Sequence, residues 1–354
     1  MSERQLMTPA ELGLPTRGRM PKRGDWRIGL IGFGSIARNA HAPAYRRAGW
    51  TIAAAADPDP AAQQAAREFG ISNVYSDYRE LIADERVEVV DLLTHPDLRV
   101  EVVQACAEAG KPLITEKPLA GNAQEARQMV EIAERAGLRL AVHQNYRWMS
   151  ANFLVHHIVR RGFIGAPFFA GIEIIGRQDV ELAGHPFYAT CGDFLTVQWN
   201  THLVDLLRYW TGRDPVRTLA ATARMQGQSF TSDNLLVALC DFGPGLTGHI
   251  LHHELLRSTL GGVRCRVDGD AGSAAFEFWG PLALESRQLA VPVEVAVPKV
   301  EYFESFVGSM GDFLAALEEG TEPTVSGREN LATIGTVLAQ QESAEAGGRW
   351  VSCG

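Results

Sequence analysis

The sequence lacks the long apolar runs of a membrane protein and the hydrophobic block of a secretory signal. No stretch approaches the length of a bilayer-spanning helix, and the first 25 residues are polar and interrupted by Pro9, Pro15 and Pro21. Positive charge is outweighed by negative charge, giving a formal net charge of -9. Such a chain does not offer the basic face that nucleic acids or anionic membranes bind. We therefore predict a cytoplasmic protein whose partner is a small molecule.

Cysteine is also rare. The five cysteines are scattered without a C-x-x-C spacing, so neither a disulfide framework nor a zinc knuckle is expected. One further group of possible metal ligands, at residues 249–254, falls on an expected strand, where neighbouring side chains point to opposite faces. No metal site is predicted in this sequence.

The chain of 354 residues is long enough for two domains. From residue 25 to 145, short apolar strands alternate with helical segments, which is typical of βαβ units and predicts an α/β Rossmann domain with a doubly wound parallel sheet. Residues 146–354 contain longer strand-like segments and predict an α+β domain with a large open, mostly antiparallel sheet. Residues 1–24 are expected to form an N-terminal extension, and helices near the C-terminus to return toward the first domain.

An apolar strand runs into a G-x-G-x-x-A turn near the start of the first domain. Gly32 permits a tight turn, Gly34 lets the backbone approach a pyrophosphate, and Ala37 lets the next helix pack close to the sheet. Ser35 and Ile36 begin that helix, whose N-terminus favours phosphate groups. The pattern predicts a dinucleotide site, with a purely structural strand-to-helix turn as the alternative.

Asp57 ends the second apolar strand, about twenty residues beyond the glycines. A carboxylate at this point can accept a hydrogen bond from a ribose 2′-hydroxyl. It would also repel a 2′-phosphate, and no Arg or Ser follows it directly. The sequence therefore favours NAD over NADP.

A Glu-Lys-Pro tripeptide follows the expected strand at residues 112–115. Lys117 should lie at the carboxyl edge of the sheet, where its ammonium could bind a substrate hydroxyl and lower the pKa of that hydroxyl. The alternative is an exposed lysine in a turn. The residues at this edge that are expected to contact the cofactor are Thr94, Pro96, Glu116 and Lys117.

A helix expected at residues 201–211 carries His202 and Asp205 on one face, because they are three residues apart. Asp205 could hold the His202 imidazole in one tautomer for proton transfer. A structural histidine in an apolar helix is the alternative, with Asp205 paired to Arg208 or Tyr209.

These motifs together resemble the glucose–fructose oxidoreductase, inositol dehydrogenase and rhizopine catabolism (Gfo/Idh/MocA) family. The glycine turn with Asp57, the Glu116-Lys117-Pro118 tripeptide and the segment 192–205 occur in the order and spacing of that family. The resemblance extends over most of the chain, including the turn at residues 162–165. It implies NAD(P)-dependent oxidation or reduction of sugars or polyols, with Lys117 polarising the reacting hydroxyl and His202 as general acid/base.

The sequence departs from the family pattern at two positions. Gln198 replaces the acid four residues before the histidine, and Val100 replaces a histidine after the fourth strand. Gln198 can orient a hydroxyl but holds no negative charge, so Asp193 is a candidate to supply it. Arg147 follows the last Rossmann strand and could bind substrate, or it could join the domains. The residues expected on the substrate side are Arg147, Asp193, Gln198 and Asn200.

We therefore predict an NAD-dependent oxidoreductase that transfers hydride between the nicotinamide and a hydroxyl carbon of a sugar, sugar derivative or polyol. Two alternatives stay open at this point. One is a redox-neutral enzyme that uses NAD for elimination, hydrolysis or isomerisation, and the other is a non-catalytic NAD-sensing protein. An open antiparallel sheet needs covering, so a homodimer or homotetramer is expected.

Overall fold

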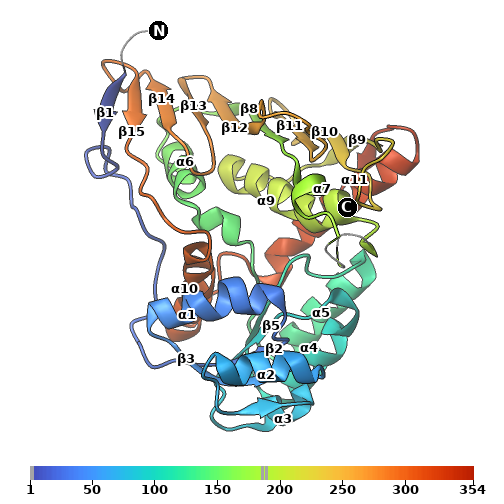
Figure 1. Cartoon of the computed structure of the whole chain (residues 1–354). Helices are drawn as coiled ribbons and strands as arrows, with labels where there is room; N and C mark the ends of the chain where they lie inside the picture. Colours follow the sequence, from blue (N-terminus) through green and yellow to red (C-terminus); the bar gives the residue numbers. More distant parts are fainter. Residues whose placement is uncertain (1–3, 185–186, 188–189) are drawn as a thin grey trace. The chain divides into compact units, whose positions relative to one another are not determined.

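The computed structural model describes residues 4–184, 187 and 190–354. The chain divides into two compact units (Figure 1). One unit contains residues 17–148 and 300–334, and the other contains residues 1–16, 149–299 and 335–354. Two details differ from the boundaries expected from the sequence. The stretch expected as an extension is shared by both units, and residues 300–334 belong to the Rossmann unit.

The Rossmann unit is built on a six-stranded sheet in which every pairing is parallel. Its strand order is β4-β3-β2-β5-β6-β7. The first strand along the chain, β2, lies in the middle of the sheet; β3 and β4 are added on one side of it, and β5, β6 and β7 on the other. The strands are β2 (Arg27–Ile31), β3 (Thr51–Ala56), β4 (Val74–Tyr75), β5 (Val89–Leu92), β6 (Leu113–Thr115) and β7 (Leu140–Val142).

Helices cross over between these strands, and side-chain caps mark the starts of some of them. Asp59 accepts the N–H of Ala61 ahead of α2, and Asn122 accepts the N–H of Glu125 ahead of α5. The helices of this unit are α1 (Ala42–Ala48), α2 (Pro60–Glu68), α3 (Tyr78–Ala83), α4 (Arg99–Ala109), α5 (Ala123–Arg135) and α10 (Glu304–Glu319), with short turns η1 (Ala37–His41), η2 (Pro96–Leu98) and η3 (Asn145–Trp148).

The second unit is built on a ten-stranded sheet with the order β1-β15-β14-β13-β12-β8-β11-β10-β9-β16. The pairings are antiparallel except β8 with β11 and β1 with β15. The strands are β1 (Gln5–Met7), β8 (Pro167–Ile175), β9 (Arg217–Ala223), β10 (Leu235–Asp241), β11 (Thr247–His253), β12 (Gly262–Gly269), β13 (Gly272–Phe276), β14 (Leu282–Ser286), β15 (Val293–Val295) and β16 (Val351–Ser352). Residues 5–7, expected to belong to a separate extension, instead form strand β1 and extend this sheet.

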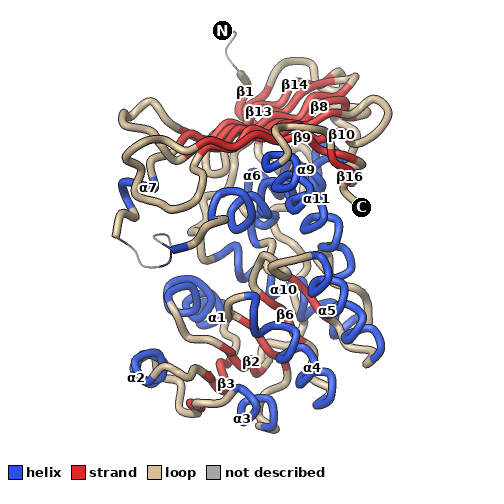
Figure 2. The backbone as a smooth tube through the Cα atoms, turned by 90° about the vertical axis from the view of Figure 1, so that its right-hand side faces the viewer, coloured by secondary structure: helices blue, strands red, loops and turns tan. Residues whose placement is uncertain are grey.

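Helices pack on one face of this large sheet (Figure 2). They are α6 (Ser150–Arg160), α9 (Asn200–Thr211) and the C-terminal part of α11 (Gly327–Glu345), and the unit also has α7 (Gln178–Glu181) and the turn η4 (Phe194–Trp199). Every residue of α9 is buried. Strand side chains alternate accordingly, as in β10, where Leu236, Ala238 and Cys240 are buried and Val237 and Leu239 are exposed.

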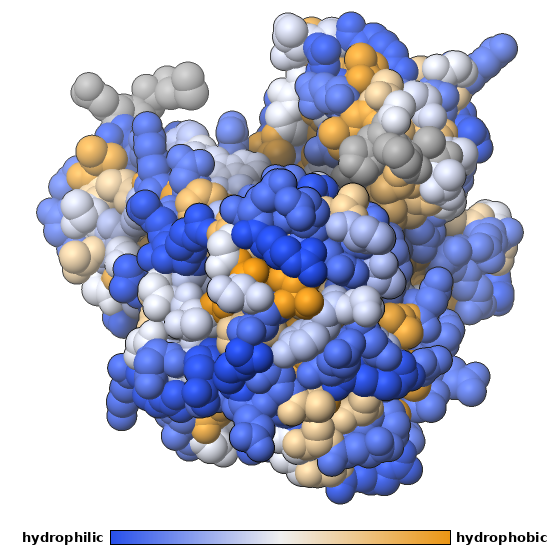
Figure 3. All heavy atoms as spheres, turned by 60° about the horizontal axis from the view of Figure 1, so that its bottom comes forward, coloured by the Kyte–Doolittle hydropathy of each residue, from blue (hydrophilic) through white to orange (hydrophobic). Residues whose placement is uncertain are grey.

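None of the described helices is both long and apolar enough to cross a membrane. On the face drawn in Figure 3, hydrophilic side chains predominate and apolar ones form small areas between them.

Candidate active site

The predicted cofactor residues lie at one edge of the parallel sheet. Gly32 follows β2, Asp57 follows β3, Thr94 comes after β5, and Lys117 comes after β6. Since these strands are parallel neighbours, their carboxyl ends meet at the same edge. This edge includes the gap between β2 and β5, where the strand order changes from one side of the sheet to the other. Open α/β sheets bind ligands at such a position.

The glycine turn has the backbone that its sequence predicts. Gly32 has φ of +95°, and a Cβ at this residue would stand 3.2 Å from the carbonyl carbon and oxygen of Leu93. Only glycine combines that conformation with that approach. At Gly34, by contrast, no atom lies within 4 Å of where a Cβ would stand, so the backbone faces open space. Gly34 and Ser35 are exposed and Ile36 is half-buried at the start of the following helical turn.

Asp57 ties the glycine turn to the second strand. Its Oδ2 accepts the N–H of Phe33 at 2.8 Å, and its Oδ1 accepts the N–H of Asp59 at 2.9 Å. Because the residue is half-buried, the remaining lone pairs can accept ribose hydroxyls. Within the described residues, the buried Oγ1 of Thr94 has no hydrogen-bond partner. An open glycine backbone, a ribose acceptor and an unsatisfied hydroxyl at one sheet edge fit a dinucleotide.

We expect Asp57→Asn to weaken NADH binding by about ten- to hundredfold, because hydrogen bonds to a charged acceptor contribute about 1.5–3 kcal/mol each. Preference for NADH over NADPH should fall as well, since repulsion of the 2′-phosphate is removed. Fluorescence titrations with both nucleotides measure this, with Asp59→Asn, at the cap of α2, as the matched control. An unchanged NADH to NADPH ratio would show that Asp57 does not contact the ribose.

The turn that carries Lys117 is held in place by a buried arginine. Arg99 donates through Nη1 to the carbonyl of Glu116 at 2.5 Å and also to the carbonyl of Pro118, and its Nε and Nη2 donate to the carbonyl of Thr94. Burial lowers the pKa of Arg99 to about 10, which leaves it charged at neutral pH. The Lys117–Pro118 peptide bond is cis. Arg99 therefore joins the loops after β5 and β6, and Lys117 is half-buried at this edge.

Glu116, which was expected to contact the cofactor, has its side chain bound within the protein. Its Oε1 accepts from Nε2 of His41 at 2.9 Å, and its Oε2 accepts the backbone N–H of Lys117 at 3.1 Å. Both oxygens are engaged within the protein and the residue is buried. The side chain of Glu116 is therefore committed to the protein, and a contact of this residue with the cofactor stays a prediction. Its side-chain partner is a buried histidine 75 residues earlier, which local sequence does not reveal.

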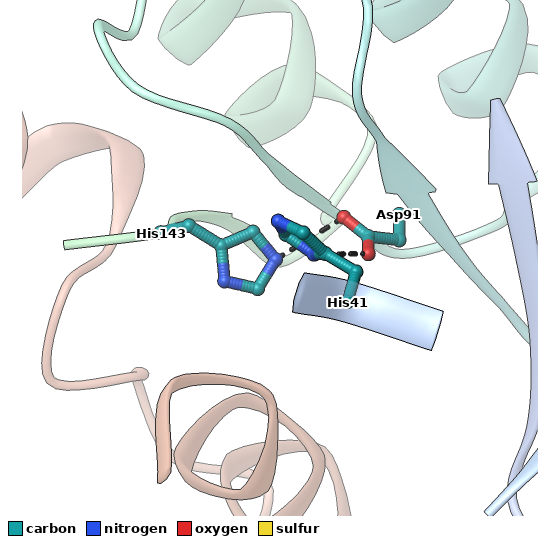
Figure 4. A group of neighbouring side chains, drawn as sticks. All are labelled: His41, Asp91 and His143. Atoms are coloured by element: carbon teal, nitrogen blue, oxygen red, sulfur yellow. Dashed lines mark hydrogen bonds and ion pairs between the residues drawn. The ribbon is translucent and has the colours of Figure 1, made fainter. Parts of the chain in front are cut away.

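His41 belongs to a buried hydrogen-bonded cluster that the sequence analysis missed. In Figure 4, the rings of His41 and His143 both point to the carboxylate of Asp91. His41 Nδ1 lies 2.9 Å from Oδ2 of Asp91, and His143 Nε2 lies 3.1 Å from Oδ1. The Tyr45 hydroxyl donates to Oδ2 at 2.6 Å. A usable signal was present: Asp91 is an acid inside an apolar parallel strand, a position normally buried on both faces.

These three residues could also offer ligand atoms to a metal, since the atoms lie within 4.8 Å of one another. In this structure the same atoms are hydrogen-bonded to each other. His143 Nδ1 is 2.9 Å from Oγ of Ser309, so both of its nitrogens are engaged as well. The arrangement is that of a charged hydrogen-bond network behind the Lys117 turn.

His202 lies in the second unit, on the buried helix α9. Asp205, one turn further along, has its Oδ1 3.9 Å from Nη1 of Arg208, as one of the alternatives anticipated. Helix α9 is preceded by a turn with π-helical spacing, η4, a geometry that often occurs at functional sites. At this turn, Nε2 of Gln198 lies 3.4 Å from both oxygens of Asp193. A carboxylate therefore contacts Gln198, the residue that replaces the acid of the motif.

Asn200 is fully buried, and its amide nitrogen donates to the carbonyl of Thr196 and to Oε1 of Gln340 at 2.5 Å. Its N–H donors are thus committed to the protein, whereas its buried Oδ1 has no hydrogen-bond partner among the described residues. A contact of Asn200 with substrate stays a prediction. Its partner on α11 is 140 residues away in sequence.

Arg147 is likewise buried. Its Nη2 donates to Oε1 of Glu329 at 2.9 Å, and Nη1 lies 3.5 Å from the carbonyl of Thr324. All three residues belong to the Rossmann unit. Arg147 therefore anchors residues 300–334 to that unit, and its contact with substrate stays a prediction.

The parallel sheet, the glycine turn and the acid after β3 define an NAD-binding Rossmann dehydrogenase. Comparison with known proteins agrees. Residues 26–144 match the model of an oxidoreductase family with an NAD-binding Rossmann fold. The chain is 32% identical to a D-apiose dehydrogenase of Paraburkholderia graminis, over 90% of this chain and 87% of that protein. It is 26% identical to an inositol 2-dehydrogenase of Rhizobium meliloti, over 87% of this chain and 93% of the relative.

A solved structure shows the same fold over nearly the whole chain. It is an oxidoreductase from Agrobacterium radiobacter in complex with NAD+, L-tartaric acid and magnesium, with a TM-score of 0.85 and 27% identity over 93% of this chain and 98% of that one. The chain therefore belongs to the Gfo/Idh/MocA oxidoreductase family. It is a dehydrogenase that uses NAD and acts on a CH–OH group.

Proposed function

We propose that the substrate is a sugar, a sugar derivative or a polyol such as an inositol, oxidised at one hydroxyl carbon. The observation that carries this is the position of Lys117, directly after β6, at the sheet edge that also carries the glycine turn and Asp57. Relatives with D-apiose and inositol dehydrogenase names support the substrate class.

In this proposal Lys117 donates a hydrogen bond to the reacting hydroxyl oxygen and stabilises the negative charge that develops there. His202 takes the hydroxyl proton. The C–H bond then breaks, and NAD accepts its electron pair together with the hydrogen, which leaves a carbonyl group. Arg99 assists by holding the turn that carries Lys117 through the carbonyls of Glu116 and Pro118 while it also binds the carbonyl of Thr94 in the loop after β5.

Asp193 has a defined part in this scheme. Its contact with Gln198 places a negative charge next to the position of the missing acid, where it stabilises an imidazolium at His202. We expect Asp193→Asn to lower kcat about tenfold and to move the pH profile of kcat toward lower pH, because the imidazolium loses stabilisation. Steady-state rates across pH measure this. If neither kcat nor its pH profile changes, Asp193 has no part in the proton transfer.

The substrate class is tested with purified protein, NAD or NADP, and a panel that contains D-apiose, other aldoses, sugar acids, levoglucosan and inositols. We expect reduced-nicotinamide absorbance to grow with NAD and at least one panel member. NAD binding without absorbance change on any member would contradict the proposal. Substrate conversion without net NADH would instead indicate the redox-neutral alternative.

We also propose that a second copy of the chain covers the open face of the ten-stranded sheet. Val237 and Leu239 are 42% and 39% exposed on this face, and Glu173 lies opposite Arg264 on the neighbouring strand. Apolar side chains beside charges of both signs suit a self-complementary interface. Light scattering should give a dimer or tetramer, and Val237→Glu with Leu239→Glu should shift it toward monomer. A monomeric native protein at micromolar concentration would contradict this.

A further inference from the structure

The buried cluster behind the Lys117 turn contains a histidine with a carboxylate at each ring nitrogen. Nδ1 of His41 faces Asp91 and Nε2 faces Glu116, both at 2.9 Å. A neutral imidazole has one N–H and one lone pair, so it can donate to only one of them. An imidazolium donates to both. The Tyr45 hydroxyl also lies 3.1 Å from Nδ1, but it donates to Asp91 at 2.6 Å and so does not supply a proton to that nitrogen. The geometry therefore indicates that His41 is charged in the folded protein.

The groups around His41 agree with that charge. Asp91 on β5 and Glu116 after β6 are carboxylates, Tyr45 on α1 donates its hydroxyl to Asp91, and His143 after β7 binds the other oxygen of Asp91. From α10, the neighbouring side chains are the uncharged Phe306 and Ser309. Burial by itself would lower the pKa of His41, but the charge of Asp91 and the hydrogen bonds to both carboxylates raise it to about 9.

Glu116 connects this cluster to the residue proposed to act on the substrate. One of its oxygens accepts from His41, and the other accepts the backbone N–H of Lys117. Burial would raise the pKa of Glu116, yet the hydrogen bond and charge of His41 lower it, so the carboxylate stays ionised. The turn with π-helical spacing, η1, ends at His41 and brings this side chain to the sheet.

We propose that His41 is a positioning residue for the reaction: its imidazolium fixes the Glu116 carboxylate against the backbone of Lys117 and offsets the negative charge beside that lysine. His41 touches neither substrate nor cofactor and acts only through Glu116. This inference rests on the proposed role of Lys117. Lys117 is thus held from two directions, by Arg99 through backbone carbonyls and by His41 through a side chain.

The proposal has a defined pH dependence. The pKa of His41 is raised in the folded protein to about 9. The doubly donating form is therefore present below the ordinary pKa of histidine, persists above it, and is lost as the pH rises through about 9. Above that pH, a neutral His41 donates to only one of the two carboxylates, and its positive charge no longer offsets the negative charge of Glu116. We expect kcat of the wild type to fall on this alkaline side.

The test compares wild type with His41→Gln, Glu116→Gln and the double variant, with His157→Gln on α6 as the control. We expect His41→Gln to lower kcat by about ten- to hundredfold, with little change in NADH affinity and without the alkaline fall near pH 9. In the double variant, kcat should be no lower than in the less active single variant. Both substitutions interrupt the same series of contacts, from His41 through Glu116 to the backbone of Lys117. The control should keep the kcat and pH profile of the wild type.

Three results separate the possibilities. If wild type turns over and His41→Gln keeps its kcat and pH profile, the positioning role is overturned while the proposed function stands. Additive losses in the double variant overturn the route through Glu116. If wild type makes no NADH on any sugar or polyol, the proposed function and the positioning role both fall.

Should His41→Gln not fold, nitrogen-15 NMR of the histidines of the wild-type protein replaces it. We expect one ring that is protonated at both nitrogens at pH 8 and loses a proton near pH 9. A neutral His41 at pH 8 would overturn the proposal.

Discussion

Lys117→Met should lower kcat by about 10²- to 10⁴-fold while leaving NADH binding within about twofold of the wild type. The methionine keeps the length of the side chain and removes its charge, so the developing alkoxide loses its hydrogen-bond donor. Gly34 and Asp57, the residues expected to contact the cofactor, lie on other loops and should be unaffected. The measurement is steady-state kinetics beside a fluorescence titration with NADH.

The matched control is Lys22→Met. Lys22 is exposed, and its backbone N–H, not its side chain, binds Glu318. It should keep the wild-type kcat. A Lys117→Met enzyme with near-normal kcat would remove Lys117 from the chemistry, whereas equal losses in kcat and in NADH affinity would indicate a disturbed cofactor site.

Replacing His202 with Asn should lower kcat by about 10²- to 10⁴-fold as well, because no group then takes the hydroxyl proton. Asn keeps polarity at a buried position on α9 and cannot act as a base near neutral pH. The pH profile of kcat should lose the limb that belongs to the base. The readout is kcat across pH, with NADH affinity measured in parallel.

His157→Gln is the control for this variant, because His157 lies on α6, which packs against α9. It tests whether any change of histidine in this helical layer lowers activity. Retention of both kcat and the pH limb in His202→Asn would assign the proton transfer to another group.

Much of the Rossmann unit could be predicted because its signals are local. The glycine turn, the capped helices and the position of Asp57 depend on residues within one βαβ unit, and the relatives confirm the family. The position of Lys117 at the sheet edge could be predicted for the same reason, since the Glu-Lys-Pro tripeptide directly follows an apolar strand. Local patterns of this kind specify backbone conformation, and backbone conformation places these residues.

The side-chain partners of three other residues could not be predicted, because these partners are distant in sequence. Arg147 pairs with a residue 182 positions away, Asn200 with one 140 away, and Glu116 with one 75 away. A polar side chain next to a motif is equally compatible with a ligand and with such a partner. Strand β1 was not predicted for a similar reason. Three residues show little periodicity, and the partner strand β15, although adjacent in the sheet, comes much later along the chain.

Asp91 is the position where sequence could have revealed more. An acid within an apolar parallel strand requires a buried partner of opposite charge or a set of donors. His41 and His143 are the partners in the structure, but no local sequence pattern distinguishes them from the other histidines among the ten in the chain.

The most direct test of hydride transfer uses a substrate from the panel that carries deuterium on the reacting carbon. If hydride passes from the reacting carbon to NAD, the deuterium appears at C4 of NADH, with one NADH formed for each carbonyl product. Deuterium that returns to a product without net NADH, or is lost to water, would contradict a simple dehydrogenase and indicate the redox-neutral reaction.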